Sequence, residues 1–323
     1  MADRDGRIEP AVPIVSEAYR TPNGLMIHGR IEDALESKIL ESVSGQVSLL
    51  ITSPPFPLVR KKKYGNETGE RYLSWLSDLA PKLTTLLAPS GSIVIEIGNA
   101  WEPGEPAMST LPLEALLEFK RAAGLYLCQH VICHNPARLP TPAAWVTVDR
   151  IRLKDSFTHV WWLSKTPRPK ANNKKVLTPY RQDMQRLLAS QKYNPGRRPS
   201  GHVISQKGFL TDHGGSISAN VLDFDDPRAL PSSLLKIANT SWDANYRQYC
   251  NANELEPHPA RMQPELVGFF SELLTDPGDL IFDPFAGSNT TGAVAEKLGR
   301  RWVGVEASEN YIEGSKGRFV EQA

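Results

Sequence analysis

Residues 47–56 read VSLLITSPPF, an apolar run that leads into two consecutive prolines. The run at residues 47–51 predicts a buried strand of a parallel sheet, because such strands are covered on both faces. Neither proline has an N–H, and each fixes its own φ angle and pushes the preceding residue toward extended geometry. The chain is therefore expected to leave the strand as a stiff turn at residues 53–56.

This turn carries a serine hydroxyl, proline carbonyls and the aromatic ring of Phe56. We expect it at the carboxyl edge of the sheet, where open α/β sheets bind their ligands. An aromatic face beside hydrogen-bond acceptors suits a flat substrate with an exocyclic amino group. A rigid surface turn without a function is the alternative that these four residues alone leave open.

The composition is that of an ordinary globular protein. Of 323 residues, 40% are hydrophobic and 23% are charged, which allows a substantial buried core. No apolar run approaches the ~20 residues that a membrane-spanning helix requires, and the polar residues 1–10 do not resemble a secretory signal. The three cysteines have no disulfide-framework spacing, so we expect a reducing, intracellular setting.

Apolar periodicity places further elements around the first strand. Helices are predicted at residues 29–44, 71–87, 111–123 and 264–274, and strands at residues 92–98, 125–133, 155–165, 279–282 and 301–305. The order strand, helix, strand predicts parallel crossovers and an α/β fold. Residues 1–24 are predicted to be irregular, and residues 89–91 to form a turn.

Basic residues gather in one part of the chain. Between residues 165 and 198, ten lysines and arginines stand against a single acid, Asp183. Such a block indicates a surface that binds a polyanion, although charge runs are more often plain solvated faces. Because periodicity weakens from residue 166 to residue 256, we predict a recognition region there. It divides the sheet domain into residues 1–165 and 257–323.

A second candidate site lies at residues 283–292, which read DPFAGSNTTG between a predicted strand and a predicted helix. Gly287 lets the backbone approach a ligand, and the helix offers unpaired N–H groups at its start. Glu306 ends the next strand about twenty residues downstream, where an acid commonly binds the hydroxyls of a ribose. A P-loop would need a lysine here, and the dinucleotide fingerprint Gly-x-Gly-x-x-Gly is absent. S-adenosylmethionine, with its ribose and cationic amino group, fits this turn.

Taken together, these motifs resemble the permuted (beta-class) DNA amino-methyltransferases, and most closely the PvuII-type cytosine-N4 methyltransferases of restriction–modification systems. The resemblance is carried by residues 52–56 (TSPPF), 283–292 and 258–261 (HPAR), with support from residues 160–165 and 198–202. It implies a Rossmann-like methyltransferase fold: a mostly parallel seven-stranded sheet with helices on both faces, plus a smaller DNA-recognition region. Residues 1–165 would then be the catalytic half, and residues 257–323 the cofactor half.

The resemblance also implies roles for single residues. Ser53, Pro54 and Pro55 would accept hydrogen bonds from the target amino group, and Phe56 would stack on a base flipped out of the duplex. The cofactor S-adenosylmethionine would be bound by Asp283, Pro284, Phe285, Gly287, Ser288, Asn289, Thr290 and Glu306, and by the closing segment His258, Pro259, Ala260 and Arg261. Two departures from the family pattern are Met262-Gln263 in place of Phe-Pro and Arg30 in place of an aspartate after Gly29.

The target atom can be narrowed from the residues. Methylation at carbon 5 of cytosine typically uses a Pro-Cys pair, and none of the three cysteines follows a proline. Serine at the head of the turn favours cytosine N4 over adenine N6, which stays an alternative. A DNA-binding protein that has lost catalysis also stays open, as does a methyltransferase of RNA or of protein glutamine.

Remaining residues concern DNA contacts and metals. Candidate DNA contacts are Arg60, Lys61, Lys62 and Lys63 beside the catalytic turn, and Arg197, Arg198, Ser200 and His202 in the recognition region. Cys128, His130, Cys133 and His134 lie on one short predicted strand, where alternate residues face opposite sides, and no second ligand pair has matching spacing, so we expect no metal site. Glu96 could orient Ser53 or be a plain polar strand end.

We expect double-stranded DNA as partner, no membrane, a monomer in a prokaryotic cytoplasm, and a restriction endonuclease as functional but not physical partner.

Overall fold

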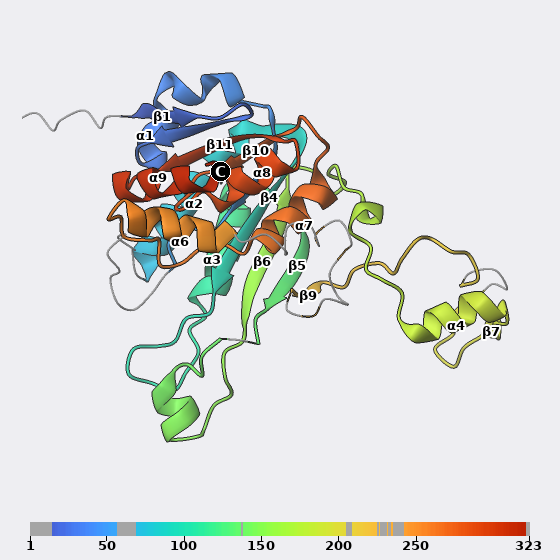
Figure 1. Cartoon of the computed structure of the whole chain (residues 1–323). Coiled ribbons are helices and arrows are strands. Elements are labelled where there is room, and N and C mark those ends of the chain that lie inside the picture. The colour runs from blue at the N-terminus through green and yellow to red at the C-terminus, as the bar shows by residue number, and fades with distance from the viewer. Residues whose placement is uncertain are drawn as a thin grey trace, which may run out of the picture.

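The computed structural model describes residues 15–56, 69–136, 138–204, 209–224, 226, 231, 234 and 242–320. A large sheet with helices on both faces forms the body of the protein (Figure 1). Its strands are β1 (Ser16–Arg20), β2 (Gly24–His28), β3 (Val47–Thr52), β4 (Leu87–Gly98), β5 (Tyr126–His134), β6 (Phe157–Ser164), β9 (Val221–Asp223), β10 (Leu280–Asp283) and β11 (Arg301–Glu306).

Two further strands, β7 (Gly196–Arg197) and β8 (Val203–Ile204), form a separate small hairpin. The helices are α1 (Ile31–Glu36), α2 (Glu70–Leu86), α3 (Leu111–Ala122), α4 (Gln182–Ser190), α6 (Trp242–Ala252), α7 (Pro264–Leu274), α8 (Thr290–Lys297) and α9 (Glu309–Ser315). Short helical turns are η1 (Lys38–Val43), η2 (Ala144–Val148), η3 (Asn173–Val176) and η5 (Lys316–Arg318). Among the described helices, none is both long and apolar enough to cross a membrane.

The strand order is β1-β2-β11-β10-β3-β4-β6-β5-β9. Neighbours from β2 to β4 are parallel, and β6 runs antiparallel between β4 and β5. The seven strands from β2 to β5 form the mostly parallel sheet that was predicted. Two edge strands, β1 and β9, raise the total to nine. Both add to exposed edges, whose free N–H and C=O groups accept a further strand.

Three local predictions were wrong. Residues 16–20 were expected to be irregular, yet they form β1 because the edge of β2 supplies their hydrogen-bond partners. The predicted turn at residues 89–91 lies inside β4, where Gly91 passes so close to the Val47 carbonyl that a Cβ would lie 2.5 Å from its oxygen. The single helix expected at residues 29–44 is divided into α1 and η1 at Ser37, whose hydroxyl caps η1.

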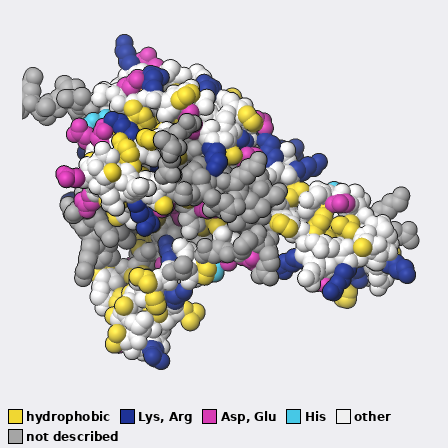
Figure 2. Space-filling view, in the orientation of Figure 1, with side chains coloured by type: hydrophobic (Ala, Val, Ile, Leu, Met, Phe, Trp, Pro, Cys, Tyr) yellow, Lys and Arg dark blue, Asp and Glu magenta, His cyan; other side chains and the backbone are white. Residues whose placement is uncertain are grey.

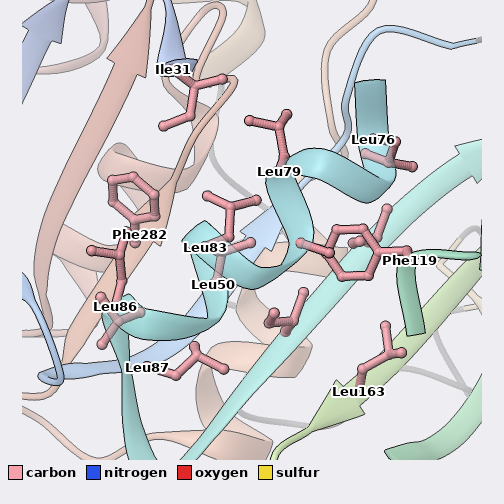
Figure 3. Packing of buried hydrophobic residues seen from close by; sticks show 14 of the residues in the cluster. Ile31, Leu50, Leu76, Leu79, Leu83, Leu86, Leu87, Phe119, Leu163 and Phe282 are labelled. Carbon is pink, nitrogen blue, oxygen red and sulfur yellow. The ribbon is translucent and has the colours of Figure 1, made fainter. Parts of the chain in front are cut away.

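The core lies on both faces of the sheet. On one face, α2 buries every third or fourth residue against Leu50 and Phe282 of the sheet, and Phe119 of α3 packs beside them (Figure 3). These α2 residues are Tyr72, Leu76, Leu79, Leu83 and Leu86. On the other face, α7, α8 and α9 cover Ile51, Ile281 and Trp302. Full burial of each such side chain contributes about 1.5–3 kcal/mol, so the strand ends that carry the candidate site rest on a well-packed body.

The segment of residues 166–256 is joined to this body at both ends. Near its start, Lys170 Nζ lies 2.5 Å from Asp279 Oδ2, and Lys175 pairs with Asp276. Near its end, β9 pairs with β5, and α6 packs against α9 and η5. The part that includes α4 and β7 stands away from the sheet (Figure 1).

Candidate functional site

The Ser-Pro-Pro-Phe turn leaves β3 between β10 and β4, at the middle of the carboxyl edge. Its Phe56 ring lies against Gly98, the last residue of β4. A Cβ added to Gly98 would lie 2.9 Å from Cε2 of that ring. A side chain at this position would have to displace the ring, so the glycine at the end of β4 lets the ring lie on the strand end.

The turn and the predicted cofactor segments line one pocket of about 470 Å³. From the catalytic prediction, it includes Ser53, Pro54, Pro55 and Phe56. From the cofactor prediction, it includes Asp283, Pro284, Phe285, Gly287, Ser288, Thr290, Glu306, His258, Ala260 and Arg261. Pro259 and Asn289 are outside the lining, and Asn289 is fully buried. The structure therefore brings together the two motifs that lie far apart in the sequence.

Asp283 ties the two motifs to each other. Its Oδ1 accepts hydrogen bonds from Thr52 Oγ1 at 2.7 Å and from the Phe285 N–H at 3.1 Å, and its Oδ2 accepts one from Thr291 Oγ1 at 2.6 Å. Burial raises the pKa of the Asp283 carboxyl, although these three donors oppose the rise. The carboxyl thus fixes the end of β3, the turn after β10 and the start of α8 in one arrangement.

Glu306 stands at the end of β11, beside β10. Its Oε2 accepts a hydrogen bond from the Gly287 N–H at 2.8 Å, and its Oε1 accepts one from the Ser308 N–H at 2.9 Å. Burial raises the pKa of Glu306. Each carboxylate oxygen has a second lone pair, so the group is held in place and can still accept hydrogen bonds from a ligand.

The turn between β10 and α8 uses the left-handed backbone region twice, at Gly287 (φ +51°) and at Asn289 (φ +53°). Asparagine tolerates this conformation better than most residues. The Asn289 amide caps α8, since its Oδ1 accepts a hydrogen bond from the Gly292 N–H at 2.9 Å. Its Nδ2 donates to the Tyr19 hydroxyl at 3.0 Å, which anchors the turn to β1.

His258 lies over Gly287. A Cβ on that glycine would approach the imidazole Nε2 to 3.1 Å, so a larger residue would press on the ring. The His258 N–H donates to the Tyr246 hydroxyl at 2.9 Å, and the ring packs edge-on against Tyr311. Burial lowers the pKa of His258 to about 4, which keeps the imidazole neutral near pH 7.

Two arginines share one carboxylate behind this segment. Asp243 accepts hydrogen bonds from Arg261 Nε at 3.1 Å and from Arg318 Nη2 at 3.2 Å. Arg318 also donates to the Ser288 carbonyl at 2.6 Å, and its side chain is only 1% exposed. Neither Arg318 nor Asp243 was predicted, because each lies outside the motifs. The fold brings Arg318 to Ser288 and Asp243 to Arg261 and Arg318.

Other pocket residues were also missed. Trp75 of α2 packs against the core, and its ring also lies 5.6 Å from the Phe285 ring at the pocket. Its Nε1 donates to Glu32 Oε1 at 2.7 Å, and Arg30 Nη2 lies 3.1 Å from the same oxygen. Burial disfavours the charged form of Glu32, but these two donors outweigh it and lower its pKa. The departure noted at Gly29-Arg30 was the available signal that residues 29–32 reach the pocket.

The predicted DNA contacts fall into three groups. Arg60, Lys61, Lys62 and Lys63 lie outside the described residues. Arg197, Ser200 and His202 are exposed on or beside the β7–β8 hairpin. Arg198 is half-buried and donates to the Tyr193 hydroxyl at 2.9 Å and to the Asn194 carbonyl at 3.0 Å, so it organises this hairpin.

The histidines and cysteines of β5 have separate partners. His130 Nε2 lies 2.9 Å from His159 Nδ1, and His134 Nδ1 lies 3.0 Å from Asp223 Oδ2. Cys133 Sγ donates toward Gln263 at 3.5 Å. No group of three or more metal-ligating side chains occurs among the described residues. Glu96 Oε1 accepts a hydrogen bond from Thr158 Oγ1 at 2.9 Å, so one of its two carboxylate oxygens makes a contact between the ends of β4 and β6.

Comparison with known proteins identifies the relatives of this arrangement. Residues 47–317 match the family model described as DNA methylase. The Type II methyltransferase M.PvuII of Proteus hauseri is 40% identical over 306 residues, covering 94% of this chain and 86% of that protein. The solved PvuII DNA methyltransferase (cytosine-N4-specific) superposes with a TM-score of 0.69 at 33% identity, over 94% of this chain and 89% of that chain. The DNA adenine methyltransferase YhdJ of Escherichia coli (strain K12) is 35% identical over 92 residues, which are 28% of this chain and 31% of that protein.

Proposed function

The chain belongs to the DNA methylase family, and on this basis we propose that it transfers a methyl group from S-adenosylmethionine to the N4 amino group of a cytosine in a short duplex DNA sequence. The observation that carries the proposal is the single pocket lined by residues 53–56 and by the turn after β10. An acceptor turn and a cofactor turn at adjacent strand ends can hold two reactants against each other, which is the main requirement of a direct transfer.

The pocket suits S-adenosylmethionine in three respects. Its volume of about 470 Å³ lies within the usual range for small-molecule sites. The oriented Glu306 carboxylate can accept hydrogen bonds from both ribose hydroxyls. The Phe285 and Trp75 rings offer an apolar wall beside it. When bound, the cofactor would supply an activated methyl group on a sulfonium.

The catalytic contribution of the chain would be electrostatic. The amino nitrogen of cytosine is a poor nucleophile because its lone pair is delocalised into the ring. The Ser53 hydroxyl and the carbonyl oxygens of Pro54 and Pro55 would accept its N–H groups and stabilise the positive charge that develops on it. One well-placed hydrogen-bonding group of this kind contributes about 3 kcal/mol. The cationic product nitrogen loses its proton readily, so no strong base is required.

Phe56 would hold the target base outside the duplex. Extruding a paired base costs a few kcal/mol, and stacking on an aromatic ring returns about 1–3 kcal/mol of it. The packing of Phe56 on Gly98 supports this role, because the ring rests on a strand end. A ring held in this way needs less ordering when the base arrives.

Cytosine N4 is favoured by the relative that covers nearly the whole chain, since the PvuII enzyme is described as cytosine-N4-specific. Adenine N6 is the second candidate, because the E. coli adenine methyltransferase matches a shorter stretch at 35% identity. The two differ in the shape of the base that stacks on Phe56 and in the ring to which the amino group is attached.

One experiment tests the proposal and separates the candidates. The purified protein is incubated with S-adenosylmethionine carrying a labelled methyl group and with plasmid DNA, and the DNA is digested to nucleosides. We expect the label in N4-methylcytosine. Label in N6-methyladenine would replace the cytosine proposal with the adenine one, and no label in DNA would leave a DNA-binding protein without catalysis. Omission of the protein is the control.

A role in restriction–modification follows from the same proposal and is supported by the relative's description as a Type II methyltransferase. We propose that the chain acts as a monomer in the cytoplasm, that residues 166–256 read the sequence, and that methylation blocks a cognate endonuclease. Plasmids isolated from cells that express the chain should resist one type II endonuclease in a panel and remain sensitive to the others.

A further inference from the structure

Residues 29–32 line the pocket on the side away from the catalytic turn. They follow β2, and the neighbouring strands β2, β11, β10 and β3 are parallel, so their carboxyl ends stand in that order along one edge of the sheet. Glu306 ends β11, and residues 53–56 follow β3. All three groups belong to the pocket lining. Glu306 therefore lies between residues 29–32 and the catalytic turn.

The chemistry of the cofactor can be matched to this order. In S-adenosylmethionine the ribose carries the adenine on one side, at C1′, and the sulfonium on the other, at C5′. With the ribose hydroxyls at Glu306 and the methyl group toward residues 53–56, the adenine extends toward the end of β2. The Gly29 N–H donates to the Glu306 carbonyl at 2.9 Å, so residues 29–32 begin directly beside the ribose site.

Glu32 brings a carboxylate to this part of the pocket. Its Oε1 accepts hydrogen bonds from Trp75 Nε1 at 2.7 Å and from Arg30 Nη2 at 3.1 Å, and its side chain is 27% exposed. These donors lower the pKa of Glu32 although burial opposes them, so the group is charged near pH 7. Both donors bond Oε1, and each carboxylate oxygen has two lone pairs, so Oε2 can accept a hydrogen bond from a ligand.

A solvated surface charge is the simpler explanation of an acid here. Acidic and basic side chains are interspersed over the upper part of the molecule in Figure 2, and exposed ion pairs contribute little. Glu32 differs because it lines the pocket and bonds the indole of Trp75, whose ring lies 5.6 Å from the Phe285 ring in the pocket wall. In addition, Arg30 stands where the family pattern has an aspartate, and Glu32 supplies a carboxylate two residues later.

We propose that Glu32 recognises the adenine of S-adenosylmethionine by accepting a hydrogen bond from its 6-amino group, and that Trp75 and Arg30 position the carboxylate. The inference rests on the proposed function and adds the contact that selects the base of the cofactor. A site that is built to bond an amino group rejects an analogue without it, because its own polar group is then left unpaired.

The test measures binding, not catalysis. Isothermal calorimetry gives the Kd of S-adenosylhomocysteine and of its analogue in which hydrogen replaces the 6-amino group. Wild type should bind S-adenosylhomocysteine about tenfold more tightly or better. Glu32→Met keeps the length of the side chain without an acceptor, so the ratio of the two Kd values should fall to about twofold or less. Asp33→Asn removes the acid of the next residue, which is outside the pocket lining, and should keep the wild-type ratio.

Glu32→Gln is the second variant. Trp75 and Arg30 both donate to the position of Oε1, so they should retain the amide oxygen there. The amide NH2 would then face the 6-amino group, and the preference should again be lost. If Glu32→Met binds neither ligand, the ratio in Glu32→Gln decides.

The proposal is wrong if wild type binds the two ligands equally, or if Glu32→Met weakens both by the same factor. The second result would mean that Glu32 supports the pocket wall or contacts a part that both ligands share. Loss of the preference in Asp33→Asn would also overturn the proposal, and in all three cases the proposed function stands. A wild-type protein that binds neither ligand overturns the cofactor assignment as well. One that shows the expected preference and labels no DNA overturns methyl transfer alone.

Discussion

Thr52 at the end of β3 donates a 2.7 Å hydrogen bond to Asp283 at the end of β10, and both side chains are buried. The two residues are 231 positions apart in the sequence, yet they lie at the heads of the two motifs that line the pocket. The bond therefore holds the distance between the proposed methyl acceptor site and the proposed cofactor site.

Replacing Thr52 by valine keeps the shape of the side chain and removes the donor. Asp283 then loses one of three hydrogen bonds in a buried position, so we expect a loss of about 1–3 kcal/mol in the free energy of unfolding. Chemical denaturation measures this loss, and methylation kinetics should show a lower kcat as the two turns separate. Thr52→Ser keeps the hydroxyl and serves as the control; a serine variant as damaged as the valine variant would show that the methyl contact matters, not the bond.

Phe56→Ala removes the stacking ring. If stacking contributes about 1–3 kcal/mol, kcat/KM should fall by about fivefold to 150-fold while the Kd for S-adenosylmethionine stays within twofold of wild type. Isothermal calorimetry and steady-state methylation separate the two effects. Equal losses of both would mean that the ring belongs to the cofactor side of the pocket.

Gly98→Ala tests the seat of the same ring. A Cβ there would lie 2.9 Å from the Phe56 ring and displace it, so activity should fall although the catalytic turn itself is intact. In the Phe56→Ala background the added methyl group has no ring to displace, and its effect should largely vanish. A double-mutant cycle measures this coupling, and additive effects would contradict the contact as the cause.

Glu306→Gln tests the proposed ribose contact. Gln keeps an acceptor oxygen but loses the charge, and hydrogen bonds to charged groups are worth about 1.5–3 kcal/mol, so the Kd for S-adenosylmethionine should rise about tenfold or more. The pKa of Glu306 is raised, so the wild-type carboxylate is protonated at a higher pH than an ordinary glutamate. Affinity should therefore weaken as the pH falls through that raised pKa, in wild type and not in the variant. The effect of the Glu306 carboxyl on the free energy of unfolding has the opposite pH dependence. Because its pKa is raised in the folded protein, its contribution to stability declines as the pH rises through that pKa.

Local sequence signals were sufficient for much of the fold. The apolar runs before residues 53 and 283 predicted β3 and β10, and their following turns depend on prolines and a glycine whose backbone preferences are intrinsic. The same signals predicted α7 and most of α2. They failed at β1, whose hydrogen-bond partners lie on β2, and at residues 89–91, which lie within β4 where its register with β3 is interrupted between Leu87 and Ser92.

The site residues were predictable where one short motif carries the chemistry. They were not predictable where residues from distant segments of the chain come together only in the fold. Arg318, Asp243 and Trp75 belong to different helical segments, and none has a neighbour in the sequence that marks it. Arg318 lies in η5, which packs against α6 and α9, and from there it donates to the carbonyl of Ser288. Two cations of the basic block show the converse, since Lys170 and Lys175 pair with acids on the body. A count of charges could not separate these structural lysines from candidate DNA contacts.

His258 gives the protein a defined sensitivity to acid. Its pKa is lowered from about 6.5 to about 4 by burial over Gly287, so the unfolded chain binds this proton more readily than the folded chain does. The stability from the neutral imidazole is therefore fully present above about pH 6.5 and is lost as the pH falls toward 4, at most about 3 kcal/mol for this one group. Urea denaturation of wild type and of His258→Gln between pH 7.5 and about pH 4 measures this effect. We expect the unfolding free energy of wild type to fall more steeply on acidification than that of the variant. A difference that stays constant over this range would mean that the imidazole is already solvated in the folded state.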